Sequence, residues 1–144
     1  MIKLSRLPPT ALVFGALLLG LAMALPWAYV GGQHVGLDWV GAQAAIPAVL
    51  LGFTAMVAVA SPRGRRWAVP AATVLGVLAG YGSLALARAI PTMAAVWNGA
   101  EGSRGPALVA ILASEAVFIL AAWSTLLPRS HDGAHRLWRD DPDP

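Results

Sequence analysis

The feature that most constrains this chain is a set of four long apolar runs, residues 11–30, 40–60, 67–87 and 105–127, that contain a single charged side chain, Glu115. A helix needs about 20 apolar residues to cross the roughly 30 Å hydrocarbon core of a bilayer. In helices of soluble proteins, polar residues recur every three or four positions and form a polar face, and these segments have no such pattern. The segments therefore predict four membrane-spanning helices, over residues 11–30, 42–60, 67–88 and 106–127.

Inside a bilayer each span must satisfy its own backbone hydrogen bonds, so helices are expected here and strands are not. The predicted fold class is an all-α integral membrane protein, a four-transmembrane-helix bundle over residues 1–128. A polar, flexible cytoplasmic tail is expected over residues 129–144. Charged residues make up only 12% of the chain, against about a quarter in soluble domains, which supports this class.

The distribution of Lys and Arg predicts the orientation, because short positively charged loops stay in the cytoplasm. Only Arg88 and Arg104 fall on one side of the predicted membrane. The other side holds Lys3, Arg6, Arg63, Arg65, Arg66, Arg129, Arg136 and Arg139. Both termini are therefore predicted to be cytoplasmic, in a multi-pass protein of the inner (plasma) membrane. The external segment 88–104 could hold a short interfacial helix around residues 93–97.

A different reading of the N-terminus stays open. Residues 1–6 are basic, an apolar core follows, and Ala22-Met23-Ala24 resembles a signal-peptidase site. Cleavage would leave three spans. The apolar stretch is long for a signal sequence, however, and an even number of spans fits the charges, so four spans are favoured.

Six aromatic residues fall at or near the ends of the predicted spans, as amphipathic rings do at a membrane interface. They are Trp27, Tyr29, Trp39, Trp67, Trp97 and Trp123. We expect them to anchor the helices, without a chemical role.

Glu115 is the strongest candidate for a functional residue, because a carboxylate in mid-helix costs roughly 2 to 3 kcal/mol or more to insert. One interpretation is a proton or cation relay facing the bundle interior. The other is a packing role, in which Glu115 bonds to Thr54, Thr73, Ser83 or a backbone carbonyl. An ion pair with Arg88 is not expected, since Glu115 lies some 13 Å below the outer interface at 1.5 Å per residue from Pro106. Arg88 is expected to reach the headgroups instead.

Two of the predicted spans carry small residues at four-residue spacing, which lets helix backbones approach closely in lipid. They are Ala72, Gly76 and Gly80 in the third span and Ala44, Ala48 and Gly52 in the second. We expect the face of the third span to pack within the chain, against the second or the fourth span, rather than against another protein.

No cofactor and no metal site are predicted. His34 and Asp38 are four residues apart, as are His131 and His135, but two ligands without a third are weak evidence for a metal. The spans contain no histidine to hold a haem, and the chain contains no cysteine. Its net charge of +3 lies in short clusters, so a nucleic-acid partner is not expected.

The layout resembles the actinobacterial tryptophan-associated transmembrane proteins, which are small four-span chains with no established activity. The residues that carry this likeness are Trp27 at the end of the first span and the basic turn from Arg63 to Trp67. The tail Leu137-Trp138-Arg139-Asp140-Asp141-Pro142 adds to it. The resemblance implies a bacterial inner membrane and transfers no site residues.

Two functional classes follow from the sequence. The first is a small non-enzymatic accessory or structural component, embedded in the lipid bilayer, that packs against a larger membrane complex. The alternative is a small proton- or cation-coupled transporter that uses Glu115. An enzyme is not expected, because most chemistry needs an acid–base pair or a metal.

Overall fold

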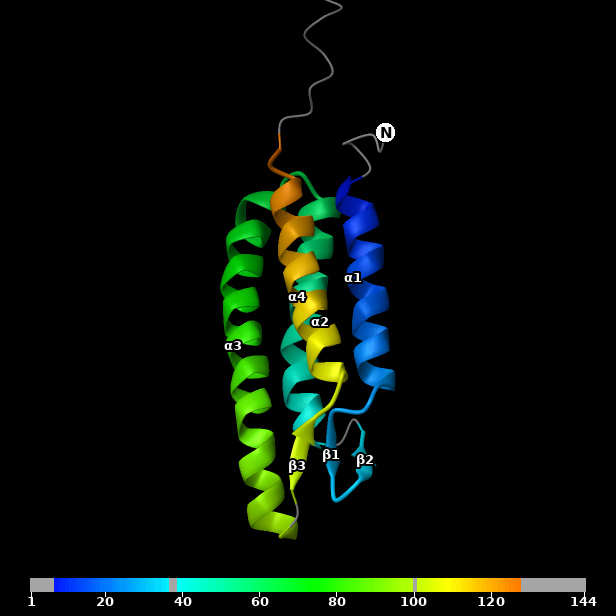
Figure 1. Ribbon diagram of the computed structural model, residues 1–144. Coiled ribbons are helices and arrows are strands. Elements are labelled where there is room, and N and C mark those ends of the chain that lie inside the picture. Colours follow the sequence, from blue (N-terminus) through cyan, green and yellow to red (C-terminus); the bar gives the residue numbers. More distant parts are fainter. Residues whose placement is uncertain (1–6, 37–38, 100, 128–144) are drawn as a thin grey trace, which may run out of the picture.

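The computed structural model describes residues 7–36, 39–99 and 101–127. Within them lie four α-helices, α1 (Leu7–Ala24), α2 (Trp39–Ala60), α3 (Arg65–Asn98) and α4 (Ala107–Ser124). All four are long and apolar enough to cross a membrane, which confirms the predicted set of four apolar helices. The start of α1, the α2–α3 turn and the end of α4 lie at one end of the bundle (Figure 1).

The bundle is apolar on the outside and filled with small residues on the inside. Its buried residues are mostly alanines, such as Ala48, Ala55, Ala72 and Ala121, all 0% exposed. The large side chains Leu17, Phe53, Val77 and Leu120 are at least 60% exposed. Small residues bring helix backbones together when lipid, rather than water, surrounds the bundle. The surface is therefore suited to a hydrocarbon solvent.

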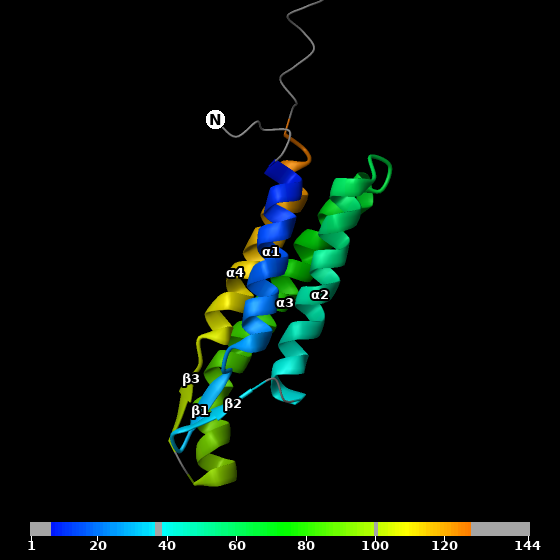
Figure 2. The ribbon, with the colours of Figure 1, turned by 90° about the vertical axis from the view of Figure 1, so that its right-hand side faces the viewer.

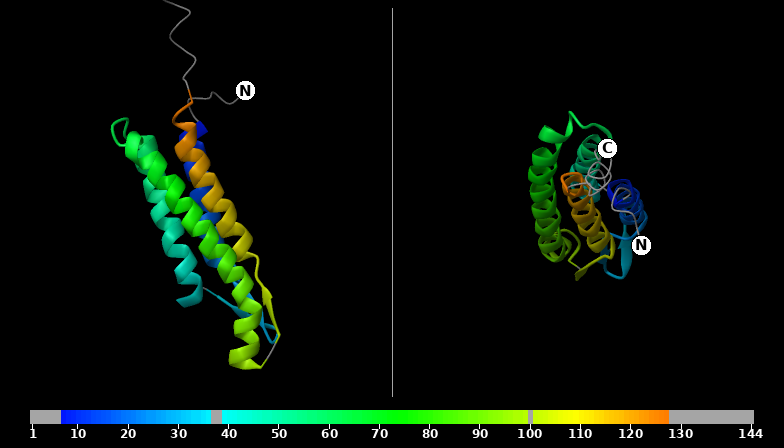
Figure 3. Two further views of the ribbon diagram at one scale, coloured as in Figure 1. Left: turned by 90° about the vertical axis from the view of Figure 1, so that its left-hand side faces the viewer. Right: turned by 90° about the horizontal axis from the view of Figure 1, so that it is seen from above.

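Contacts between helices are most extensive within the pairs α1–α4 and α2–α3. Figure 1 shows α4 between α1 and α3, with α2 behind them, and the view from above agrees (Figure 3). Helix α4 is the most enclosed of the four, with half of its residues buried. Its side chains therefore make most of the contacts that join the two pairs.

The predicted bounds of the first span were wrong at both ends. Helix α1 begins at Leu7, because Pro8 and Pro9 fit the first helical turn, where backbone N–H groups have no helical acceptor. It ends at Ala24, and residues 28–30 form a strand. Pro26 accounts for this end, since a proline disfavours the helical conformation in the residue before it.

Helix α3 is 34 residues long, about 51 Å at 1.5 Å per residue, which exceeds the bilayer core. The separate interfacial helix expected around residues 93–97 was wrong, because these residues continue α3 as far as Asn98. Pro91 lies inside the helix and has no N–H to donate to the carbonyl of Ala87. The side chain of Arg104 replaces that donor, with 2.7 Å between its Nε and the Ala87 oxygen.

The all-α prediction missed a small antiparallel sheet at the end of the bundle opposite the termini (Figure 2). Its strands are β1 (Ala28–Val30), β2 (Gln33–Val35) and β3 (Gly102–Arg104), in the order β2-β1-β3. Tyr29 pairs with His34 on one side and with Ser103 on the other. We call this sheet, together with residues 90–98 of α3, the cap. It joins the α1–α2 connection to the α3–α4 connection.

Glycines allow the cap to close at two places. Gly31 and Gly32 both have positive φ angles, 58° and 81°, which a two-residue hairpin turn between β1 and β2 requires. Gly105 approaches the backbone of Pro26 so closely that a Cβ would overlap its carbonyl oxygen. This approach lets the N–H of Gly105 donate to the carbonyl of Trp27 at 2.9 Å.

Candidate functional site

Glu115 lies midway along α4 and points into the protein, where it is only 2% exposed. The hydroxyl of Ser83 on α3 donates to its Oε1 atom at 2.9 Å, and Ser83 is fully buried. Thr54 and Thr73, the other partners considered from the sequence, donate to carbonyls of their own helices. A buried polar contact therefore joins α3 to α4.

The second carboxylate oxygen of Glu115, Oε2, has no hydrogen-bond partner among the described residues. It lies beside Gly80, where a Cβ would stand 3.7 Å from it. A buried polar atom without a partner costs free energy, which makes this oxygen the least satisfied atom of the site. The group can hold two helices together, and it has one acceptor free for a further donor or a proton.

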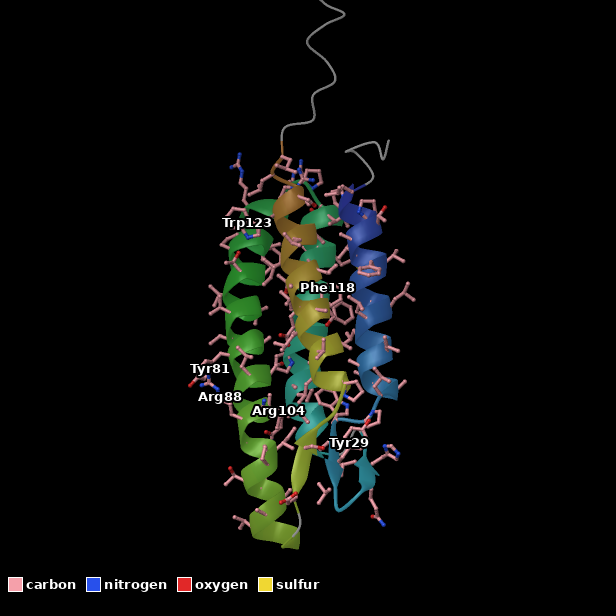
Figure 4. The ribbon with its side chains drawn as sticks, viewed as in Figure 1. Tyr29, Tyr81, Arg88, Arg104, Phe118 and Trp123 are labelled. Carbon is pink, nitrogen blue, oxygen red and sulfur yellow. The ribbon has the colours of Figure 1, made fainter. Side chains whose placement is uncertain are left out.

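Arg88 does not complete this site. It is exposed and points away from the bundle, on the outer face of α3 (Figure 4). Since Glu115 is enclosed between α3 and α4, no ion pair joins the two side chains within the part of the chain that the structure describes. The position of Arg88 is suited to contact with headgroups.

The small residues predicted on the third span lie on the buried side of α3. Ala72 is fully buried, and Gly76 is so close to Ile119 of α4 that a Cβ would stand 2.6 Å from its Cγ1. Gly80, on the same side, faces Glu115. In the described chain this face therefore contacts α4, where its last glycine leaves room for the carboxylate.

Two of the three small residues of α2 are also buried, and the third, Gly52, contacts a side chain of α4 that the sequence did not single out. Ala44 and Ala48 are 5% and 0% exposed. Gly52 stands against the ring of Phe118, 3.0 Å from Cζ to a Cβ built on the glycine, and Gly15 of α1 meets the same ring at 2.7 Å. Phe118 therefore fills the space that the two glycines leave. These residues are distant in sequence, so no local sequence pattern predicts the contact.

The aromatic residues expected at the membrane interface differ from one another in how exposed they are. Trp67 and Trp123 are 57% and 49% exposed, and the indole of Trp123 donates to Thr73 Oγ1 at 3.0 Å. Trp27 departs from the expectation, because it is 2% exposed within the core below the cap. Its Nε1 has no partner among the described residues. Pro26 ends the helix early and turns this ring inward.

The histidine considered for metal binding lies on the sheet of the cap. The ring of His34 stacks edge-on against Tyr29, with 5.1 Å between the ring centroids. Asp38, His131 and His135 lie outside the described residues. The cap therefore shows an aromatic pair at His34, with no contact that would make it a metal ligand.

Hollows on the described surface include two apolar grooves and one polar hollow. An apolar groove of about 590 Å³ lies between α1 and α4, and a smaller apolar one between α1 and α2. A polar hollow in the cap is lined by Tyr29, Glu101 and Ser103, among others. None of these three is lined by Glu115, so the carboxylate does not contact them.

No protein-family model matches the chain, and no significant match was found among curated proteins or among solved structures. The resemblance of its layout to the tryptophan-associated transmembrane proteins stays a prediction.

Proposed function

We propose that the chain crosses the inner (plasma) membrane four times, with both termini in the cytoplasm. The exposed Leu, Val and Phe side chains support insertion, because they cover all four helices. The exposed Arg63 and Arg66 lie at the same end as the start of α1 and the end of α4, which fits retention of that end by its positive charge.

Reporter fusions test this orientation. A cytoplasmic reporter should be active when fused at Leu127 or after Pro144, and an exported reporter should be silent at both sites. The exported reporter should be active at Gly36, between α1 and α2. An exported signal at either C-terminal site, including one caused by cleavage of the first span, would contradict four spans with cytoplasmic ends.

We propose further that this is a small non-enzymatic accessory component that packs beside a larger membrane complex. The observation that carries this proposal is the enclosure of Glu115 between α3 and α4, with Ser83 bonded to it. A group so placed links helices and has no access to a substrate in the described hollows. The lipid-facing sides then remain as contact surfaces, and they include open glycines on α1 and α3.

Affinity purification in mild detergent with quantitative mass spectrometry tests the accessory role. We expect one membrane complex to copurify at a fixed ratio. Gly20 on α1 and Gly82 on α3 have nothing within 4 Å of a Cβ, so leucine at either position should preserve the fold. Loss of the complex in only one variant, Gly20→Leu or Gly82→Leu, would identify the contacting helix. A chain that purifies alone and monodisperse would contradict the proposal.

A second candidate function is a small proton- or cation-coupled carrier. The unsatisfied Oε2 of Glu115 favours it, because a free buried acceptor is suited to bind a proton or cation. Such a carrier must open a path to Glu115 during its cycle. The substitutions of Glu115 described in the Discussion separate this role from packing.

A further inference from the structure

Arg88 is the one charged side chain on the outward flank of a helix in the described chain. The other described charges lie in the α2–α3 turn, in the first turn of α3, in or beside β3, or, for Glu115, inside the bundle. Arg88 lies about 33 Å along α3 from Arg66, at 1.5 Å per residue. If Arg66 stands at the inner interface, Arg88 therefore stands at the outer edge of the hydrocarbon core, which is roughly 30 Å thick.

A second polar group lies on the same face of α3. Tyr81 precedes Arg88 by about two helical turns, and both side chains project away from the other helices (Figure 4). Tyr81 is 74% exposed, and neither side chain has a hydrogen bond or an ion pair with another described residue. The Cα atom of Tyr81 lies about 10 Å deeper in the membrane than that of Arg88. Its hydroxyl is therefore surrounded by acyl chains, which offer it no acceptor.

Small residues lie beside these two polar groups. Gly82 and Ala85 are exposed, and a Cβ at Gly82 would meet nothing within 4 Å. Leu78, which is 62% exposed, lies one turn before Gly82. Together with Tyr81 and Arg88 these residues form a strip with three- and four-residue spacing, the pattern of a helix–helix contact. We call it the α3 strip, and its two small residues leave a notch for the backbone of a second helix.

The polar groups of the α3 strip select an acidic partner at a particular depth. One carboxylate between Tyr81 and Arg88 can accept from both the hydroxyl and the guanidinium, because both side chains are long enough to reach it. Such a carboxylate lies about one turn deeper than Arg88, within the acyl region. A lipid phosphate stays at the headgroup level and reaches only Arg88, whereas a side chain of a neighbouring helix reaches both groups.

We propose that the α3 strip binds a transmembrane helix that carries one Asp or Glu near its outer end. The carboxylate pairs with Arg88 and Tyr81, and the backbone of that helix fits the notch at Gly82 and Ala85. This inference rests on the proposed accessory role, since it names the kind of helix that the larger complex supplies. In a chain without its partner, headgroups contact Arg88 instead.

A synthetic helix in POPC proteoliposomes tests this pairing. The probe is a donor-labelled leucine–alanine peptide of bilayer length with one Glu a single turn inside one end, and its control carries Gln there. The chain has no cysteine, so Ser103→Cys on β3 supplies a single exposed site for the acceptor dye. Energy transfer should show that the Glu peptide binds about tenfold more tightly, the effect of one interhelical polar contact in model peptides. Equal binding of the two peptides would overturn the proposal.

Substitutions on exposed positions of α3 locate the contact. Arg88→Gln and Tyr81→Phe should each reduce the preference for the Glu peptide, and Arg88→Glu should transfer it to a peptide with Lys at the same position. Gly82→Leu fills the notch and should weaken binding of both peptides. Arg66→Gln is the matched control, because it removes the same charge at the other end of the same helix, and the preference should be unchanged. If this control acted like Arg88→Gln, the attraction would be general and the site would be refuted.

Two rival occupants give different results. If an anionic lipid filled the strip, native mass spectrometry from nanodiscs of POPG and POPC would show POPG bound to wild type and lost in Arg88→Gln, and the Glu peptide would not displace it. If a second copy filled it, wild type would appear as a dimer and Gly82→Leu as a monomer. Either result would overturn this proposal. The accessory role fails separately, since it is contradicted only if no complex copurifies with the wild-type chain.

Discussion

Replacing Gly105 with alanine should destabilise the protein by about 2 to 3 kcal/mol, the upper part of the range for substitutions that overpack a well-packed region. The new Cβ would overlap the carbonyl oxygen of Pro26 and lie 2.7 Å from the carbonyl carbons of Pro26 and Trp27. These are backbone atoms, so no rotamer change relieves the contact. The hydrogen bond from Gly105 to Trp27 would be lost, together with the 3.2 Å bond from Ala107 to Pro26.

An unfolding titration in mixed micelles, followed by tryptophan fluorescence, measures this loss of stability. The fluorescence should report it well, because Trp27 is buried next to the contact between Gly105 and Pro26. Gly36→Ala is the matched control, since a Cβ at Gly36 meets nothing within 4 Å. The control should unfold like wild type. If Gly105→Ala were as stable as the control, the close contact between the two connections would be wrong.

Substitution of Glu115 should distinguish a packing role from a carrier role. Alanine removes both the bond to Ser83 and the volume of the side chain, and should cost about 2 kcal/mol, the lower end of large-to-small changes in a packed core. Glutamine keeps the shape and the acceptor for Ser83, and should cost less than about 1 kcal/mol. In a packing role the glutamine variant therefore behaves like wild type.

Proteoliposomes with an internal pH-sensitive dye supply the second measurement. Glutamine cannot exchange a proton, so a carrier that uses Glu115 would lose its pH-gradient-driven flux in the Glu115→Gln variant while keeping its stability. Ser83→Ala is the matched partner, and combining it with Glu115→Ala should cost less than the sum of the single changes. A Glu115→Leu variant with full stability and unchanged function would contradict both roles.

The sequence predicted the four helices because the absence of charge over about 20 residues is a local property. The same holds for Glu115 and the small-residue faces, which stand out within single segments. The ends of the helices were harder to predict, because a proline can either end a helix or lie inside one. Pro26 ends α1 early, whereas Pro91 is tolerated within α3 because Arg104, distant in sequence, bonds to the carbonyl that it leaves free.

The cap and the Phe118 contact were missed for the same physical reason. Each depends on residues that meet only after the helices have packed, such as Tyr29 with Ser103, or Gly15 with Phe118. The adjacent glycines Gly31 and Gly32 are the local signal for a hairpin, because glycine readily adopts the positive φ angles that such a turn requires. Ser83 was named as one of several partners of Glu115, since packing alone decides among them.

The cap also has a consequence for biosynthesis. Strand β1 is made before α2 and α3, whereas its neighbour β3 is made after both. At 5 to 20 residues per second, the roughly 70 residues between them take about 4 to 14 s to synthesise. During that time the edge of β1 lacks its partner strand β3, and the carbonyl of Trp27 lacks the N–H of Gly105 that bonds to it in the folded protein. The α1–α2 connection is therefore completed only when the α3–α4 connection has been made. A ribosome-bound chain that stops before residue 102 cannot reach the native state.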